Sequence, residues 1–342
     1  MNPHSYAMIV AANSNYLPGL LALVNSLVAC GNERYCEVVV PFAGWDPKAL
    51  LGHGVQIVPV AVSPTADKKA MCAARTRVAR EFAPNYESLA LFDADMLVTS
   101  ELRLFFQVAA AGFLVAGNDD SHDDQSKYLT DKGTPVSRTY TYKVICTSPF
   151  FFSKLHAQQI FGSAGGKETT EQLQETHGDW QGLNLALSLN PEISDRMLVF
   201  PSSQFTGIHH TNFKPQTFHM FNAWNGEVPL ATRECVTPDL LVLTADYQRV
   251  YSIHGPFWIP GYTDSLLTTM RGYYCDMLGL KPEVATGWME RARNITDNTQ
   301  RLFLRHLLGG RIPFAAIRDQ IHPIHREYIR ERSLELEVSY EW

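Results

Sequence analysis

Two aspartates spaced one residue apart follow a short apolar segment of this 342-residue chain. Ser88 to Phe92 has the composition of a buried strand, and Asp93 and Asp95 come directly after it. Both side chains can point the same way from an extended backbone. A buried carboxylate without a partner is costly, so such a pair indicates either a bound cation or a strand end that turns into solvent. Divalent cations such as Mn²⁺ or Mg²⁺ use such ligands and keep open positions for phosphate oxygens.

A histidine after another apolar segment is a candidate third ligand. Arg249 to Ile253 is predicted to be a strand, and His254 follows it directly. A histidine in that position is also common in protein cores, where it is hydrogen-bonded to its neighbours. The two aspartates and this imidazole together predict a divalent-cation site.

The elements that must position these residues alternate in the first third of the chain. Apolar periodicity predicts strands at Tyr6 to Ala12, Cys36 to Phe42, Gln56 to Val62 and Ser88 to Phe92, and helices at Tyr16 to Cys30 and Ala66 to Phe82. This alternation predicts an α/β fold with a mostly parallel, Rossmann-like sheet covered by helices on both faces. Ligands of such sheets bind beyond the carboxyl ends of the strands. The aspartate pair and the segment Ala11 to Tyr16 both lie at strand ends of this kind.

The later part of the chain is less regular. Residues 117–138 are polar and without periodicity, which is typical of a long functional loop. A helical pattern returns at Trp180 to Ser188, whereas the aromatic-rich stretch 201–239 has no clear assignment. From Leu266 onward the chain is predicted to be mostly helical, with breaks at Pro282, Gly309-Gly310 and Pro323.

Composition excludes some partners. The net charge is −6 and lysine and arginine do not cluster, which argues against binding of nucleic acid. The six cysteines are scattered and include no Cys-x-x-Cys pair, which is typical of reduced thiols. The sequence shows no signal peptide and no apolar stretch that could span a bilayer, so we expect a cytoplasmic protein. Contact of the C-terminal helices with the inner face of a membrane stays open, as does the oligomeric state.

Four segments of the chain, in this order, resemble glycosyltransferase family 8, the group that includes glycogenin and bacterial lipopolysaccharide galactosyl- and glucosyltransferases. They are VAANSNYLPGLLALVNSL, AARTRVAREFAPNYESLALFDADMLV, DWQGLN and YSIHGPFW. The resemblance spans about residues 6–260 and implies a GT-A catalytic domain at 1–262 followed by a helical extension at 263–342. It implies a metal-dependent hexosyltransferase of the retaining type. The donor would be a nucleotide-diphosphate sugar with uridine as the base, and the acceptor a hydroxyl of a saccharide or glycoconjugate.

The resemblance also implies roles for individual residues. Asp95 and His254 would hold the metal, and Asp93 would bind both the metal and the ribose. The other nucleotide contacts would come from residues after the first strand and from one of two arginines, between which the sequence does not choose. These are Ala11, Asn13, Asn15 and Tyr16, with Arg75 or Arg77. The catalytic residues near the transferred sugar would be Asp119, Asp179 and Gln181.

Several positions depart from the family pattern. The usual Asp-Gln-Asp is Asp179-Trp180-Gln181, so a tryptophan occupies the position under the anomeric carbon of retaining members. CTSPFFFS at 146–153 replaces an expected Asn-Ser-Gly, and no Lys-Pro-Trp follows His254. The segment HHTNFKP has a histidine and a lysine at nearly the expected separation, so His209 could replace His254 and Lys214 could bind phosphate.

These departures leave the stereochemistry open. A retaining enzyme would use its leaving diphosphate to assist attack on the same face of the sugar. An inverting enzyme would use Asp179 as a general base. The pair Phe257-Trp258 suits either stacking on an acceptor sugar or packing in a core.

Three other functions fit parts of the sequence less well. A phosphatase of the haloacid dehalogenase type would have a threonine or valine where Leu97 stands, and its aspartates would follow the first strand. A sugar nucleotidyltransferase would have a glycine-rich basic loop in place of AANSNY. A non-catalytic protein that binds nucleotide sugars or glycans on a decayed GT-A fold would not need Asp93, Asp95 and Asp179.

Overall fold

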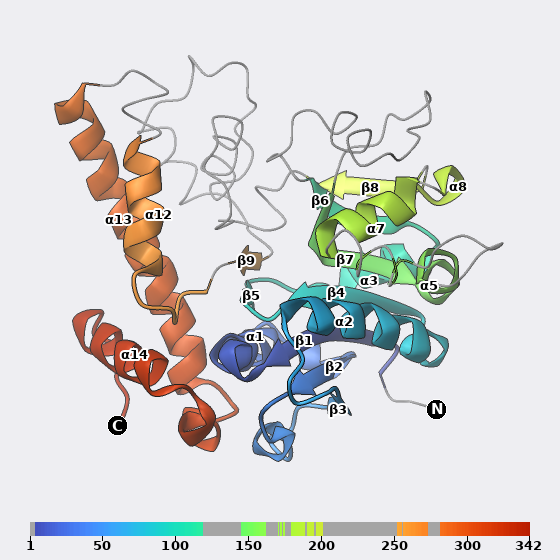
Figure 1. Cartoon of the computed structure of the whole chain (residues 1–342), viewed down its shortest axis with the longest axis horizontal. Coiled ribbons are helices and arrows are strands. Elements are labelled where there is room, and N and C mark those ends of the chain that lie inside the picture. The colour runs from blue at the N-terminus through green and yellow to red at the C-terminus, as the bar shows by residue number, and fades with distance from the viewer. Residues whose placement is uncertain are drawn as a thin grey trace.

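The computed structural model describes residues 4–118, 145–161, 170, 172, 174, 179–188, 190–194, 196–200, 252–254, 256–272 and 281–342. A sheet of seven strands lies at the centre of this part of the chain, in the order β3-β2-β1-β4-β7-β6-β8 (Figure 1). The strands are β1 (Tyr6–Asn13), β2 (Cys36–Ala43), β3 (Ile57–Ala61), β4 (Ser88–Asp93), β6 (Leu114–Asn118), β7 (Ile145–Ser153) and β8 (Met197–Phe200). Only β7 runs against its neighbours, so the sheet is mostly parallel.

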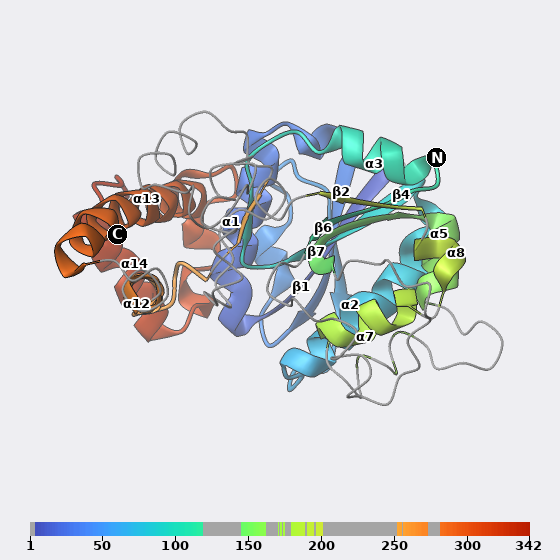
Figure 2. The same ribbon diagram turned by 90° about the horizontal axis from the view of Figure 1, so that it is seen from above.

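Helices cover both faces of the sheet, as Figure 2 shows from above. Alternate residues of β1 point to opposite faces, so Met8 and Val10 share one core with α1 (Leu17–Ala29) and α3 (Arg103–Ala110). Ala7 and Ile9 belong to a second core on the other face. The helices that build this second core are α2 (Lys68–Phe82), α5 (Lys154–Phe161), α7 (Asp179–Ser188) and the short α8 (Pro191–Ser194). The predicted α/β architecture is therefore confirmed.

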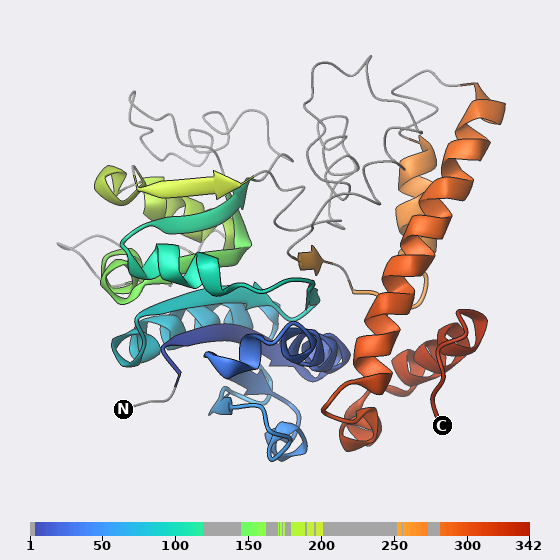
Figure 3. The ribbon, with the colours of Figure 1, turned by 180° about the vertical axis from the view of Figure 1, so that it is seen from behind.

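A second, two-stranded sheet lies beside the carboxyl end of β4. Its strands are β5 (Met96–Val98) and β9 (Ser252–His254), which run antiparallel with Met96 opposite His254. Figures 1 and 3 both show β9 between the central sheet and the C-terminal helices. His254, the last residue of β9, therefore lies beside Met96, the residue that follows Asp95.

The C-terminal segment forms α12 (Tyr262–Gly272), α13 (Pro282–Gly309) and α14 (Pro323–Glu335). Pro282 and Pro323 begin helices, where the fixed φ of proline fits and its missing N–H costs nothing. Helix α13 crosses α1 and packs against it, and its leucines belong to the same core as the α1 leucines (Figure 3). The side chain of Asn25 reinforces this contact, since its amide donates to the carbonyls of His306 and Ile312. A boundary between a catalytic domain and an extension at residue 262 stays a prediction.

The predicted elements of the first third are confirmed, with ends that shift by two residues or fewer. Strand β7 was not predicted, because CTSPFFFS was interpreted only as a replaced motif. Most of the polar stretch 117–138 and the whole aromatic-rich stretch 201–239 lie outside the described residues. No helix in the described ranges has the length and apolar composition that crossing a bilayer requires.

Candidate functional site

The aspartate pair lies where β4 leaves the sheet. Residues Leu89 to Phe92 are fully buried, and Asp93 is the last residue of the strand. The Asp93 side chain is 31% exposed, whereas Asp95 is buried at 7%. Strand β1 runs parallel to β4 with Ala11 opposite Asp93, so the carboxyl ends of the two strands meet at the same edge. The topology therefore places the pair next to the segment after β1.

A buried arginine neutralises one of the two carboxylates. Arg75 on α2 is 2% exposed, and its guanidinium forms an ion pair with Asp93 and donates to the Phe92 carbonyl at 3.3 Å. The Asp93 backbone N–H donates to the Ser148 hydroxyl at 2.6 Å, which adds a contact from β7. Of the two candidate arginines, Arg75 is the one that reaches the aspartates. Arg77 lies two residues further along α2 and is half-buried.

The segment after β1 is a short 3₁₀ turn, η1 (Ser14–Tyr16). The Asn13 side chain caps it by accepting the Asn15 backbone N–H at 3.1 Å. Burial raises the pKa of Tyr16 to about 12, and the charges of Asp95 and Asp93 add to this shift. The Tyr16 hydroxyl therefore stays protonated beside the carboxylates. The turn to which the resemblance assigns nucleotide contacts is thus near the aspartate pair.

The segment that follows β9, residues 256–262, closes the site from the side of the C-terminal helices. Trp258 is fully buried, and its indole N–H donates to the Asn15 carbonyl at 3.1 Å. Its ring stacks on Phe303 of α13 with centroids 5.7 Å apart. Phe257 is also buried, at 1% exposed. Of the two uses that the sequence left open for Phe257 and Trp258, core packing is observed, and neither ring is available to stack on an acceptor sugar.

Tyr262 was missed by the sequence analysis. Burial raises the pKa of its phenol strongly, and the charge of Asp95 adds to this shift, so the phenol stays protonated. Ser148 was missed as well. No local pattern marks either residue, because both are brought to this part of the fold only through long-range packing.

Other candidate residues are described by backbone position alone or not at all. His254 is the last residue of β9 and lies opposite Met96, which follows Asp95 in the sequence. Asp179 is the first residue of α7 and Gln181 the third. The side chain of Asn184 fixes this helix to β7, since it exchanges two 3.1 Å hydrogen bonds with the Ile145 backbone. The candidates that lie outside the described residues are Asp119, His209 and Lys214.

The charges of the site are suited to a divalent cation. The carboxylates of Asp93 and Asp95 and the guanidinium of Arg75 together have a formal charge of −1. Oxygen ligands at partly exposed strand ends are the type that Mn²⁺ and Mg²⁺ use. Among the side chains that the structure describes, no three histidines, cysteines, aspartates or glutamates form a complete metal site. A third ligand would have to come from outside this set. The pairing of β9 with β5 brings the backbone of His254 to the edge of the fold at which Asp93 and Asp95 lie.

Comparison with known proteins bears on the fold. No protein-family model matches the sequence, and no curated protein matches it either. A structure of the galactosyltransferase LgtC with donor and acceptor sugar analogs is similar at 16% identity, covering 82% of this chain and 99% of that one, with a TM-score of 0.49. An active-site mutant of LgtC is similar at 15% identity over 77% of this chain and 94% of that one, with a TM-score of 0.50.

The bifunctional glycosyltransferase WbbM is similar at 14% identity over 79% of this chain, with a TM-score of 0.51. This chain spans 50% of the length of WbbM. At these identities the likeness concerns the fold. The chain has the GT-A fold of the glycosyltransferases LgtC and WbbM.

Proposed function

We propose that this protein is a glycosyltransferase that moves a hexose from a nucleotide-diphosphate sugar, with UDP as the nucleotide, to a hydroxyl of a saccharide or glycoconjugate. The observation that carries this proposal is the convergence of Asp93, Asp95, Arg75 and the η1 turn at one edge of a GT-A sheet. This edge, beyond the carboxyl ends of parallel strands, is where α/β folds bind nucleotides.

The residues around this edge would each have a separate task. Turn η1, with Asn13, Asn15 and Tyr16, would hold the base and ribose next to Ala11. Arg75 keeps the Asp93 carboxylate in one orientation and lowers the negative charge that a diphosphate meets. Asp93, Asp95 and His254 would hold Mn²⁺ or Mg²⁺, which acts as a Lewis acid on the diphosphate as negative charge grows there.

The transferred sugar would lie toward α7. Helix α7 is fixed to β7 through Asn184, so its first turn has a defined place beyond the strands. In this proposal Asp179 and Gln181 in that turn, with Asp119, bind the sugar hydroxyls and orient the anomeric carbon. Lys214 would contact the phosphates. We propose transfer with retention of configuration, which an NMR spectrum of the anomeric proton of the product tests directly.

The experiment that tests the donor site is thermal unfolding with UDP, GDP, CMP and ADP, each with and without Mn²⁺. A ligand at about 100 times its dissociation constant adds about 2.7 kcal/mol to the free energy of unfolding. The unfolding entropy of a chain of 342 residues is about 0.7 kcal/mol/K, so Tm should rise by about 4 °C. We expect this rise with UDP and only in the presence of Mn²⁺.

Asp95→Asn keeps the size of the side chain and removes its charge. We expect it to unfold at nearly the wild-type temperature without ligand and to lose the Mn²⁺-dependent rise with UDP. Asp319→Ala, which removes a 79% exposed carboxylate of the C-terminal segment, is the control and should keep the full rise. An Asp95→Asn protein that binds UDP and Mn²⁺ as tightly as wild type would contradict the site. If no nucleotide shifts the wild type, the proposed function is wrong.

A further inference from the structure

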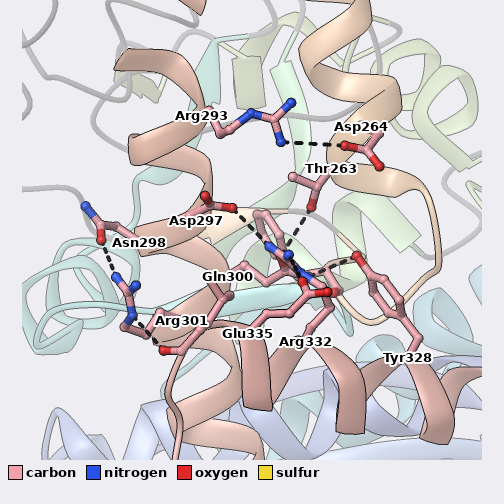
Figure 4. A network of polar contacts seen from close by, with 12 residues as sticks. Thr263, Asp264, Arg293, Asp297, Asn298, Gln300, Arg301, Tyr328, Arg332 and Glu335 are labelled. Carbon is pink, nitrogen blue, oxygen red and sulfur yellow. Dashed lines mark hydrogen bonds and ion pairs between the residues drawn. The ribbon is translucent and has the colours of Figure 1, made fainter. Parts of the chain in front are cut away.

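A buried glutamine on α13 connects the C-terminal helices with the candidate donor site. The Gln300 side chain is fully buried, and its amide N–H groups donate to the Phe257 carbonyl at 3.0 Å and to the Tyr328 hydroxyl at 3.2 Å. Its amide oxygen accepts two hydrogen bonds from Arg332 of α14, at 3.0 and 2.8 Å. Figure 4 shows these contacts together with the ion pair of Arg332 and Asp297, which measures 3.0 Å. We call Gln300, Arg332, Asp297 and Tyr328 the polar clamp.

The backbone that the clamp holds belongs to the segment 256–262. Within this segment the Ile259 N–H donates to the Pro256 carbonyl at 3.0 Å, and the Tyr262 N–H donates to the Ile259 carbonyl at 3.2 Å. These are local turn bonds, so they shape the segment but do not place it against the rest of the protein. Its placement depends on contacts with other elements, and the bond from Gln300 to Phe257 is one that α13 supplies.

The middle of this segment reaches the donor site. Trp258, next to Phe257, donates its indole N–H to the Asn15 carbonyl of η1. Tyr262, at the end of the segment, packs edge-on against the Phe257 ring, with centroids 5.3 Å apart. A shift of the Phe257 backbone would therefore move the contact of Trp258 with η1. It would also move the Trp258 ring, which lies beside Gly19 together with the carbonyl of Ala94, the residue before Asp95.

A buried polar group with all its bonds made holds one geometry more strictly than an apolar contact does, because any displacement leaves a donor or acceptor without a partner. Gln300 uses both its donors and its acceptor in this way. Apolar residues of the shared core already join α13 to α14. The polar clamp in addition fixes the position of the Phe257 backbone.

We propose that Gln300 is a positioning residue of the donor site, which it serves by holding the segment 256–262 against η1. The proposal rests on the proposed function, since it concerns the same site. If the segment leaves its place in nine molecules out of ten, the apparent dissociation constant of the donor rises about tenfold, because only the competent fraction binds.

The test uses Gln300→Glu in the full-length chain. Glutamate has nearly the same shape and still accepts hydrogen bonds from Arg332, but it cannot donate to the Phe257 carbonyl as a carboxylate. The matched control is Arg301→Met, one residue further along α13. Arg301 donates to the Leu336 carbonyl at 3.1 Å and to Asn298, so it connects α13 with the chain after α14 through other contacts.

Two readouts separate positioning from general stability. Without any ligand, we expect hydrogen exchange at the Ile259 and Tyr262 amides to speed up about tenfold in Gln300→Glu and to stay unchanged in Arg301→Met. With UDP and Mn²⁺, calorimetry should show a dissociation constant about tenfold higher for Gln300→Glu only. In the transferase assay the donor KM should rise with it, while the acceptor KM stays near the wild-type value.

The proposal is wrong if Gln300→Glu exchanges and binds as wild type does, or if Arg301→Met shows the same changes at the same loss of stability. A wild type that binds no nucleotide would overturn the proposed function instead, and the exchange experiment alone would then decide whether the clamp holds the segment. If Gln300→Glu does not fold, Gln300→Met replaces it, because methionine has a similar length and cannot donate to the Phe257 carbonyl either. The same two readouts then decide the proposal.

Discussion

Replacing Gly19 by alanine tests the closest contact between α1 and the candidate site. Gly19 is the third residue of α1, and a Cβ built on it would lie 2.4 Å from the Ala94 carbonyl oxygen and 2.5 Å from two atoms of the Trp258 ring. Real Cβ atoms essentially never come closer than 3.0 Å to such neighbours. The Ala94 carbonyl lies between Asp93 and Asp95, and Trp258 is fully buried, so neither neighbour can move without disturbing the site.

Two opposing effects set the change in stability. Alanine in place of glycine inside a helix ordinarily gains about 0.5 to 1 kcal/mol, because less backbone entropy is lost on folding. Overpacking in a well-packed core costs about 1 to 3 kcal/mol. The clash outweighs the entropy gain here, and we expect Gly19→Ala to lose about 1 to 2 kcal/mol of the free energy of unfolding. With an unfolding entropy of about 0.7 kcal/mol/K for 342 residues, Tm should fall by about 1.5 to 3 °C.

Urea unfolding measures the loss of stability, and calorimetry with UDP and Mn²⁺ measures the effect on the site, which we expect to be weaker binding. Gly309→Ala is the matched control, since Gly309 also lies in a helix but a Cβ there would have nothing within 4 Å. This control should be as stable as wild type or up to about 1 kcal/mol more stable, with unchanged binding. A Gly19→Ala protein with wild-type stability and wild-type affinity would refute the contact between α1, Ala94 and Trp258.

Two further predictions concern the ion pair at the site and the response to acid. Arg75→Met removes the buried partner of Asp93, whose side chain is 31% exposed and therefore partly screened by water. We expect urea unfolding to show that the free energy of unfolding falls by about 1 to 2 kcal/mol, less than the about 3 to 5 kcal/mol typical of a fully buried pair. Arg77→Met, two residues away on α2, should change stability by less than about 0.5 kcal/mol, and equal losses in the two variants would contradict the assignment of Arg75. Burial lowers the pKa of His156 and of His306 below the usual 6.5, so the unfolded chain binds protons there that the folded chain does not. The free energy of unfolding should therefore be at its full value above about pH 6.5 and fall as pH decreases below it, and a His156→Asn, His306→Asn double variant that keeps the whole acid dependence would show that other groups cause it.

The sequence by itself determined the local secondary structure of this protein. Strands β1 and β2 and helices α1 and α2 follow from apolar periodicity, since period 2 and period 3.6 are properties of the backbone that each short segment shows on its own. The place of Asp93 and Asp95 at a strand end follows in the same way. So does the helical C-terminal segment, with Pro282 and Pro323 at the starts of helices.

Tertiary structure alone decided which of these segments meet. The reversed strand β7 lies between β4 and β6, and β9 pairs with β5 from far along the chain. Arg75 rather than Arg77 reaches Asp93, because only one of two residues two positions apart on a helix can face the strand end. The sequence is compatible with Trp258 either stacking on a sugar or packing in the core. Its contacts with Phe303 and Gly19 show that it packs in the core. Contacts of this kind depend on packing between distant segments, which no local pattern of residues records.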